Sequence, residues 1–266
     1  MSKYIGWFSC GVTSAIACKL ALDTYGKENV DLYYIKIDSA HPDNDRFIAD
    51  CEEWFDVKIK TIQSKKYSDQ FDVIEQIRYV NGVNGAPCTL QLKKKVRFDL
   101  QKALDYPIQV FGFEFETKQV NRAIRFIEQF PETKPIFPLI EGSYTKEICA
   151  GLIIEQGIEL PTMYKLGYNN NNCIGCVKGG RGYWAKIKID FPETFQRMAE
   201  LEREVGATCI KNVYLDELKE GAGRKPKAIT PDCGSFCQIK YGDIKHKQLD
   251  LIMSNPQSIR QLYFNF

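Results

Sequence analysis

The sequence lacks a long hydrophobic run and an excess of charge of one sign. No apolar stretch reaches the roughly 18 residues that span a bilayer as a helix, and the first residues lead into a strand pattern rather than a signal-peptide core. The 36 basic and 34 acidic side chains leave a formal charge of +2. This balance neither demands nor excludes a nucleic-acid partner. We expect a cytoplasmic protein that does not enter a membrane.

Histidine is scarce and no internal repeat is present, but cysteine is plentiful, with ten residues. In a reducing compartment so many cysteines are more often thiols, metal ligands or catalytic groups than disulfides. Cys18, Cys51 and Cys149 lie on apolar faces of helical patterns, so we expect them in the core. The remaining cysteines lie in or near loops: Cys10, Cys88, Cys173, Cys176, Cys209, Cys233 and Cys237.

Strand-like and helix-like patterns alternate up to about residue 157. This order predicts an α/β fold, a doubly wound, mostly parallel sheet whose ligands bind beyond the carboxyl ends of the strands. The expected strands are Tyr4–Ser9, Val30–Asp38, Val57–Gln63, Ile108–Phe113 and Pro135–Ile140. The first expected helix ends near Tyr25, and the second carries Phe47 to Phe55. The remaining expected helices cover Tyr67–Arg78, Thr89–Leu104, Gln119–Phe130 and Thr145–Gln156.

The regular alternation of strand and helix patterns gives way to loop-like sequence after Gly157. We expect residues 1–157 to form one domain and residues 158–266 to form a loop-rich, cysteine-containing C-terminal portion with one strong helix near Pro192–Gly206. The given sequence ends in an aromatic cluster, Tyr263, Phe264 and Phe266. We expect this cluster to pack in the core or at a contact between subunits, and the second alternative would imply a homodimer.

A turn of small residues joins the first expected strand to the first helix. In Ser9-Cys10-Gly11-Val12-Thr13-Ser14, backbone N–H groups and hydroxyls can approach an anion, and the following helix points its positive dipole end at the same place. Such a turn can hold phosphate. The alternative is an ordinary strand-to-helix turn capped by Ser9 or Thr13.

This turn resembles the loop of the PP-loop ATP pyrophosphatase superfamily, S-G-G-x-D-S, at Ser9, Gly11 and Ser14, whereas Cys10 and Thr13 depart from it. Most of the chain is similar to the phosphoadenosine phosphosulfate (PAPS) reductase-like family, including versions encoded by bacteriophages. The resemblance implies an adenine nucleotide alpha hydrolase-like fold with residues 1–157 as the nucleotide-binding domain. ATP or PAPS would bind there with Mg²⁺. Cysteine is small and threonine keeps a hydroxyl, so both departures are compatible with anion binding.

The segment Ile37-Asp38-Ser39-Ala40-His41 looks like the family's Asp-Thr-Gly-His segment beside the adenosine. The resemblance implies nucleotide contacts from Asp38 and His41. The alternative is that Ser39 or Asp43 caps the next helix.

The segment from Gly112 to Arg122 is similar to the family's exit from its fourth strand. The resemblance implies that Gly112 lies beside the nucleotide and that Arg122 reaches phosphate or sulfate as a planar fork. The alternative is an ion pair of Arg122 with Glu116 or Glu128. The basic run Lys93–Arg97 allows either a solvated helix or a contact with a tRNA-like backbone.

The most particular segment of the second half is Cys173-Ile174-Gly175-Cys176, because two thiolates at this spacing can bind one metal from a tight turn. Cys233 and Cys237 form another close pair, and Cys88 heads a helix. Two close pairs can make a Zn²⁺ site or a [4Fe–4S] site, and spacing does not choose between them. Several PP-loop sulfur-handling enzymes carry an iron–sulfur cluster centred on CxxC, so the resemblance favours [4Fe–4S]. A redox-inert pair of turns is the alternative.

The resemblance implies an enzyme that adenylates an acceptor with ATP and releases pyrophosphate, for sulfur transfer or nucleotide modification. Ser9 and Ser14 would hold the pyrophosphate, and Arg122 or a lysine would stabilise the transition state. The acceptor would be tRNA, DNA or a small molecule. A second hypothesis is reduction of PAPS or adenylyl sulfate by Cys233, in an Asp-Cys-Gly segment that looks like the family's Glu-Cys-Gly, with a thiol reductant. A third is a non-catalytic nucleotide-binding protein with a structural metal site.

Overall fold

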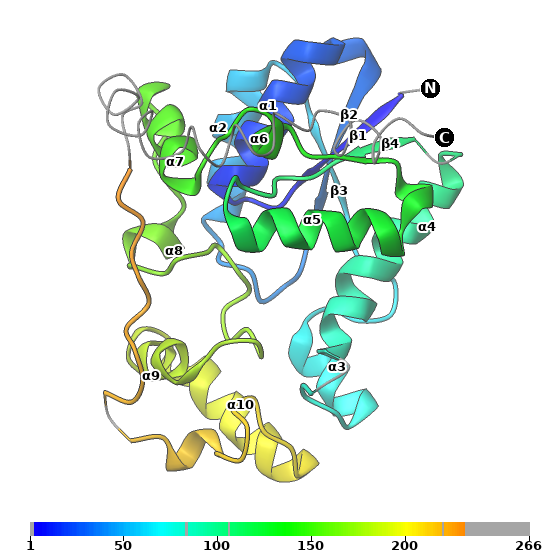
Figure 1. Ribbon diagram of the computed structural model, residues 1–266. Coiled ribbons are helices and arrows are strands. Elements are labelled where there is room, and N and C mark those ends of the chain that lie inside the picture. The colour runs from blue at the N-terminus through cyan, green and yellow to red at the C-terminus, as the bar shows by residue number, and fades with distance from the viewer. Residues whose placement is uncertain (1–2, 83–84, 106, 220, 232–266) are drawn as a thin grey trace.

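The computed structural model describes residues 3–82, 85–105, 107–219 and 221–231. At its centre lies a five-stranded sheet in the order β3-β2-β1-β4-β5, in which every neighbouring pair is parallel (Figure 1). The chain builds outward from β1 to β3 and then returns to the other side of β1, so the strand order switches between β1 and β4. The predicted doubly wound α/β fold is confirmed. The strands are β1 Tyr4–Phe8, β2 Val30–Ile35, β3 Ile59–Ile62, β4 Ile108–Val110 and β5 Pro135–Ile136.

Helices connect the strands and continue beyond the sheet. None of those in the described ranges is long and apolar enough to cross a membrane. The α-helices are α1 Val12–Tyr25, α2 Asn44–Phe55, α3 Gln70–Ile77, α4 Lys95–Ala103, α5 Thr117–Gln129, α6 Pro138–Glu141, α7 Lys146–Glu155, α8 Thr162–Lys165, α9 Arg181–Asp190 and α10 Pro192–Val205. A π-helix, Thr89–Lys94, runs directly into α4, and short 3-10 turns cover Lys27–Asn29, Pro131–Thr133 and Leu215–Glu217.

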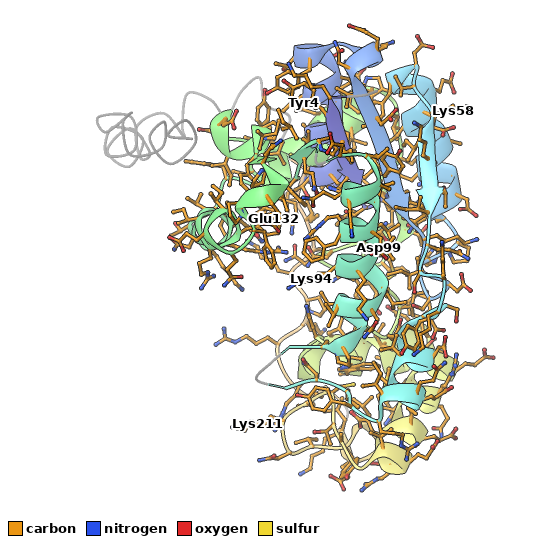
Figure 2. All side chains as sticks on the ribbon, turned by 90° about the vertical axis from the view of Figure 1, so that its right-hand side faces the viewer. Tyr4, Lys58, Lys94, Asp99, Glu132 and Lys211 are labelled. Atoms are coloured by element: carbon orange, nitrogen blue, oxygen red, sulfur yellow. The ribbon has the colours of Figure 1, made fainter. Side chains whose placement is uncertain are left out.

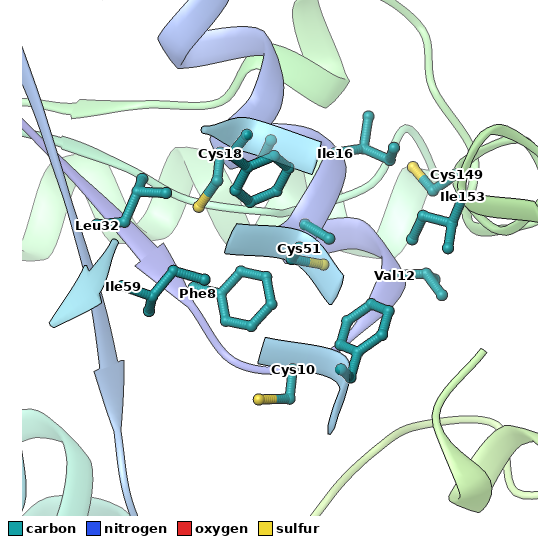
Figure 3. Close-up of a cluster of buried hydrophobic side chains, with 14 of the residues drawn as sticks. Phe8, Cys10, Val12, Ile16, Cys18, Leu32, Cys51, Ile59, Cys149 and Ile153 are labelled. Carbon is teal, nitrogen blue, oxygen red and sulfur yellow. The ribbon is translucent and has the colours of Figure 1, made fainter. Parts of the chain in front are cut away.

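The two faces of the sheet carry separate apolar cores, because alternate residues of a strand point to opposite faces. Phe8 and Leu32 face α1, α2 and α7, where the thiols of Cys18, Cys51 and Cys149 are buried as predicted (Figure 3). The other face packs against α5 through Ile5, Trp7, Tyr33, Phe111 and Phe137. Gly6 lets α1 lie close to the sheet, since a Cβ there would stand 2.5 Å from Leu32 Cδ2 and 3.1 Å from Cys18 Sγ.

A further core lies away from the sheet, around Trp184 of α9 and Met198 of α10. It also takes in Phe71 and Ile74 of α3, so residues from both sides of the expected boundary at 157 build it. Arg197 of α10 reinforces this packing with an ion pair to Asp69 at 3.6 Å.

Some elements differ from the sequence expectation, among them the short helices α6 and α8, which were not expected. The strand expected over Pro135–Ile140 ends at Ile136, because Pro138 occupies the first turn of α6. The helix expected from Thr89 starts as a π-helix. Helix α9 was not expected, because its start is rich in glycine, and only Trp184 and Ile187 on it are fully buried.

Candidate functional site

The turn after β1 is organised by the hydroxyl of Ser14. Ser14 Oγ accepts hydrogen bonds from the backbone N–H groups of Ser9 (3.0 Å) and Gly11 (3.3 Å), and it donates to the Gly11 carbonyl at 2.8 Å. The Ser9 hydroxyl lies 3.1 Å from the same oxygen. Cys10 adopts a left-handed conformation with φ +56°, which a non-glycine residue adopts only when its surroundings enforce it. The turn is therefore a fixed, tightly bonded loop.

This loop lies at the switch in strand order, at the carboxyl edge of the sheet, where α/β proteins bind ligands. Gly112, just beyond β4, lies against it, since a Cβ there would stand 2.7 Å from Ser14 Cα and 2.8 Å from Ser14 N. The predicted neighbours Gly11, Ser14 and Gly112 are thus brought together. Thr13 is partly exposed and has no side-chain hydrogen bond to any described residue, so its hydroxyl at the start of α1 is available to an anion.

The thiol of Cys10 does not point to a ligand. It is fully buried in the core beside Tyr34, and burial raises its pKa well above the ordinary value for a thiol. Cys10 therefore contributes to the loop through its backbone and not through its thiol. Its carbonyl accepts a 2.6 Å hydrogen bond from Asn171 Nδ2, which also donates to Asn44 Oδ1 at 2.7 Å.

Two residues that hydrogen-bond to the loop and to the start of α1, Asn171 and Tyr164, were not predicted from the sequence. The Tyr164 hydroxyl accepts a hydrogen bond of 3.4 Å from Val12 N at the start of α1. Asn171 Oδ1 is buried without a hydrogen-bond donor among the described residues. Asn171 belongs to the run Asn169–Asn172, which resembles an ordinary turn, and the only signal was the position of this run directly before the CxxC turn.

The residues after β2 have mixed roles. Asp38 is exposed, and its backbone N–H donates to the Ser68 carbonyl. His41 Nδ1 accepts a hydrogen bond from Asp43 N at 3.1 Å, and burial lowers the pKa of His41. Asp43 precedes α2 but makes no side-chain cap, because its carboxylate accepts hydrogen bonds from Arg46 and from Thr162 N (2.7 Å).

Arg122 lies on the α5 side of the sheet, with its guanidinium carbon 4.2 Å from the centre of the Phe113 ring. It forms no ion pair with Glu116, Glu128 or any other carboxylate of the described residues. Arg97, at the end of the basic run, lies over the same aromatic cluster, 5.2 Å from the Phe111 ring centre, and its Nε and Nη2 atoms are buried without acceptors. Figure 2 labels Lys94 and Asp99 along the continuous π-helix and α4 segment that carries Arg97, and Glu132 in the turn that follows α5.

A cavity of about 100 Å³ opens beside the loop. Ser9 from the loop and Cys173 from the CxxC turn both line it, together with Lys93 and with Asn44, Asn171 and Asn172. It is smaller than the roughly 300 Å³ of a typical small-molecule site, so it would hold only part of a nucleotide. Asp38, His41 and Arg122 do not line it. The loop and the thiol turn, 160 residues apart in sequence, therefore meet at one cavity.

The CxxC turn is held rigidly. The Tyr183 hydroxyl donates to the Cys173 carbonyl (3.1 Å) and accepts from Cys176 N (2.9 Å). Ile174 N donates to the Ser39 carbonyl at 2.8 Å, which ties the turn to the segment after β2. Gly175 has φ +75°, and a Cβ there would stand 2.7 Å from Thr194, so only glycine fits.

Two further cysteines lie beside this turn. Cys88 immediately precedes the π-helix and packs against two apolar clusters, one containing Cys209 and the other also receiving Cys173. Burial raises the pKa of Cys88 to about 11, with a further contribution from Cys176 and Cys173. Burial also raises the pKa of Cys209, with contributions from Glu202, Cys176 and Cys88. Four thiols are therefore neighbours, and Cys209 was not among the predicted ligands.

The predicted ligands Cys233 and Cys237 lie outside the described residues. Within the described part of the chain, no three His, Cys, Asp or Glu side chains already converge in metal-binding geometry. The four thiols nevertheless form a set of soft donors of the kind that Zn²⁺ and iron–sulfur clusters take. Ligation would require the side chains to turn toward a common point.

No family model matches the chain, and no curated protein matches it. The resemblance to PP-loop proteins thus rests on the residues quoted for it. The structure itself shows a strand-to-helix loop at the switch in strand order and a CxxC turn that lines the same cavity.

Proposed function

We propose that the protein binds ATP at the loop Ser9–Ser14 and uses it to activate an acceptor for sulfur transfer. The observation that carries this proposal is the shared cavity, which has Ser9 on one wall and Cys173 on another. A loop that binds phosphate and a cluster of thiols are the two components that such chemistry needs at one place. Lys93, on the same cavity, supplies a positive charge for the phosphates.

In the first step an acceptor oxygen attacks the α-phosphorus of ATP, a new P–O bond forms, and the bond to pyrophosphate breaks. The hydroxyls of Ser9 and Thr13, at the positive dipole end of α1, bind the departing pyrophosphate, with Mg²⁺ as counter-ion. In the second step a sulfur nucleophile, hydrosulfide being the simplest, forms a bond to the acceptor carbon as AMP leaves. Ser14 acts through the loop, because its hydroxyl is occupied by Gly11 and Ser9.

Cys88, Cys173, Cys176 and Cys209 would hold a metal or an iron–sulfur cluster. The support for this set is that Cys88 packs against the apolar clusters of both Cys209 and Cys173, and that the backbone of the CxxC turn is held by Tyr183. When bound, a cluster would supply an electrophilic site for sulfur, and Zn²⁺ would supply structural cross-linking of three chain segments. The protein's own contribution is to keep these thiols beside the nucleotide loop.

ATP binding tests the first part of this proposal. Calorimetry with ATP and Mg²⁺ should show binding to the wild-type protein and at least about tenfold weaker binding to Ser14→Ala, equivalent to ~1.4 kcal/mol. Thr61→Ala is the matched control, because this hydroxyl is exposed on the edge strand β3. Absence of ATP binding by the wild-type protein, or equal binding by Ser14→Ala, would overturn the proposal.

Product analysis tests the second part. With hydrosulfide and a pool of nucleotides or tRNA, pyrophosphate release should depend on an acceptor. The competing hypothesis, reduction of PAPS through Cys233, instead requires sulfite release with thioredoxin or glutathione that disappears in Cys233→Ser. A protein that binds ATP without any turnover in either assay would fit the third hypothesis, a nucleotide-binding protein with a structural metal.

A further inference from the structure

A second, larger cavity lies on the Cys176 side of the CxxC turn. It measures about 460 Å³, within the range of small-molecule sites. Cys176 and Tyr183 form part of its wall, and Asn172 lines this cavity as well as the smaller one beside the loop. The CxxC turn therefore has Cys173 on the cavity of the nucleotide loop and Cys176 on the larger cavity.

All charged side chains that line the larger cavity are positive. Lys178, Arg181 and Arg224 line it, and no Asp or Glu does. All three are exposed, and within the described ranges none of them has an ion-pair partner. Arginine and lysine without carboxylate partners around one concave surface favour a ligand with several negative charges.

The remaining lining is polar backbone and amide. Gly179 and Gly180 present their backbone without side chains, and the asparagines 169, 170 and 172 offer neutral donors and acceptors. This composition provides hydrogen bonds to uncharged parts of a ligand as well as charge for its anionic part. An apolar metabolite would leave these groups unsatisfied.

The position of the third cation is fixed by close backbone packing. A Cβ on Gly182 would stand 1.6 Å from the Arg224 carbonyl oxygen, and a Cβ on Gly223 would stand 2.7 Å from Arg181 Cβ. Gly223 has φ +81°, a conformation that favours glycine. The segment containing Arg224 therefore lies directly over the start of α9, which brings Arg224 and Arg181 to the same cavity.

We propose that this cavity binds the phosphate-bearing part of a nucleotide, either a free nucleotide or one in a single-stranded nucleic acid. The three cations match a phosphate with its neighbouring charges, and the volume suits about one nucleotide. Assigning this ligand as the acceptor of the reaction rests on the proposed function, whereas binding itself does not. In that assignment the acceptor and ATP approach the CxxC turn from its two cavities.

The test uses the full chain and two probes, uridine 5′-monophosphate and a fluorescein-labelled oligothymidylate of five residues. Loss of a charge-assisted hydrogen bond is worth about 1.5–3 kcal/mol, so Arg181→Ala and Arg224→Ala should each weaken binding about tenfold or more. Arg181→Lys, which keeps the charge, should lose less. Lys188→Ala is the control, because this residue lies on the same helix but does not line the cavity.

Comparison of the two probes distinguishes a free nucleotide from a nucleic acid as the ligand. Tight binding of the mononucleotide without a gain for the oligonucleotide indicates a free nucleotide, whereas tighter, strongly salt-dependent binding of the oligonucleotide indicates a nucleic acid. Failure of both probes to bind, or equal binding by wild type and Arg181→Ala with unchanged melting temperatures, would overturn the inference. Ser14→Ala should leave uridine monophosphate binding intact, so loss of ATP binding alone counts against the proposed function and not against this site.

Discussion

The side-chain amide of Asn171 donates a 2.6 Å hydrogen bond to the backbone carbonyl of Cys10, and this single contact joins the asparagine run before the CxxC turn to the loop after β1. The same nitrogen donates to Asn44 Oδ1, at the start of α2. Three segments distant in sequence therefore share one amide. The left-handed residue Cys10 is held at its carbonyl by this group, which links the loop's geometry to the second half of the chain.

Asn171→Ala should weaken ATP binding and lower stability. The substitution leaves the buried Cys10 carbonyl and Asn44 Oδ1 without this donor, and an unsatisfied buried polar group costs about 1–3 kcal/mol. Denaturant unfolding and ATP calorimetry measure the two effects. Asn169→Ala is the control, because Asn169 is exposed and contributes its backbone carbonyl, not its side chain, to Lys146. Equal losses in the two variants would contradict a specific role for Asn171.

Gly112→Ala should damage the loop more severely than its size suggests. The added methyl would stand 2.7–2.8 Å from backbone atoms of Ser14 and Thr13, which cannot move without shifting the start of α1. Overpacking of this kind costs about 1–3 kcal/mol, and the melting temperature and ATP affinity should both fall. Gly180→Ala should leave both nearly unchanged, since a Cβ there has no atom within 4 Å. A Gly112→Ala protein with wild-type ATP affinity would show that the loop tolerates displacement.

Cys209→Ser should reduce metal loading as strongly as Cys173→Ser. Cys209 lies with Cys88 in one apolar cluster and contributes the fourth thiol of the proposed set. Anaerobic reconstitution followed by iron and zinc analysis and an absorption spectrum measures the loading, independently of any activity. Cys233→Ser should load normally, and Cys18→Ala, in the core beside α1, controls for loss of a buried thiol. Normal loading of Cys209→Ser with failure of Cys233→Ser would instead favour Cys233, a ligand predicted from the sequence, over Cys209.

The parts of the fold that follow from local pattern were predictable. Alternating strand and helix periods predicted the five strands of the sheet, and the helical spacing of Cys18, Cys51 and Cys149 predicted their burial. The loop Ser9–Ser14 was predicted because its small residues follow a strand directly. Residues such as Asn171 and Cys209 could not be chosen, because their roles depend on contacts between segments far apart in sequence, which no local spacing encodes.

Asp43→Asn should make the free energy of unfolding depend less on pH in the acid range. Burial alone would raise the pKa of Asp43, but hydrogen bonds from Arg46 and Thr162 outweigh it and lower the pKa to about 2 from an ordinary 3.8. The stability that Asp43 contributes is therefore present above about pH 4 and is lost as pH falls from 4 to 2. Unfolding curves across this range should be less pH-dependent for Asp43→Asn, which should also be less stable at pH 7. Asp99→Asn, at an exposed residue of α4, should keep the wild-type slope.

Arg97→Met should leave the free energy of unfolding unchanged or raise it. The Nε and Nη2 atoms of Arg97 are buried without acceptors in the described structure, and burial together with the charge of Arg122 lowers the pKa of Arg97 to about 10. Desolvation of such an ion costs several kcal/mol, whereas a desolvated cation–π contact contributes about 2 kcal/mol, so an apolar side chain of similar length should pack at least as well. Arg46→Met gives the opposite expectation, because it leaves the Asp43 carboxylate without its partner. If Arg97→Met instead unfolds at clearly lower denaturant than the wild type, the aromatic rings around Arg97 stabilise the cation by more than its dehydration costs.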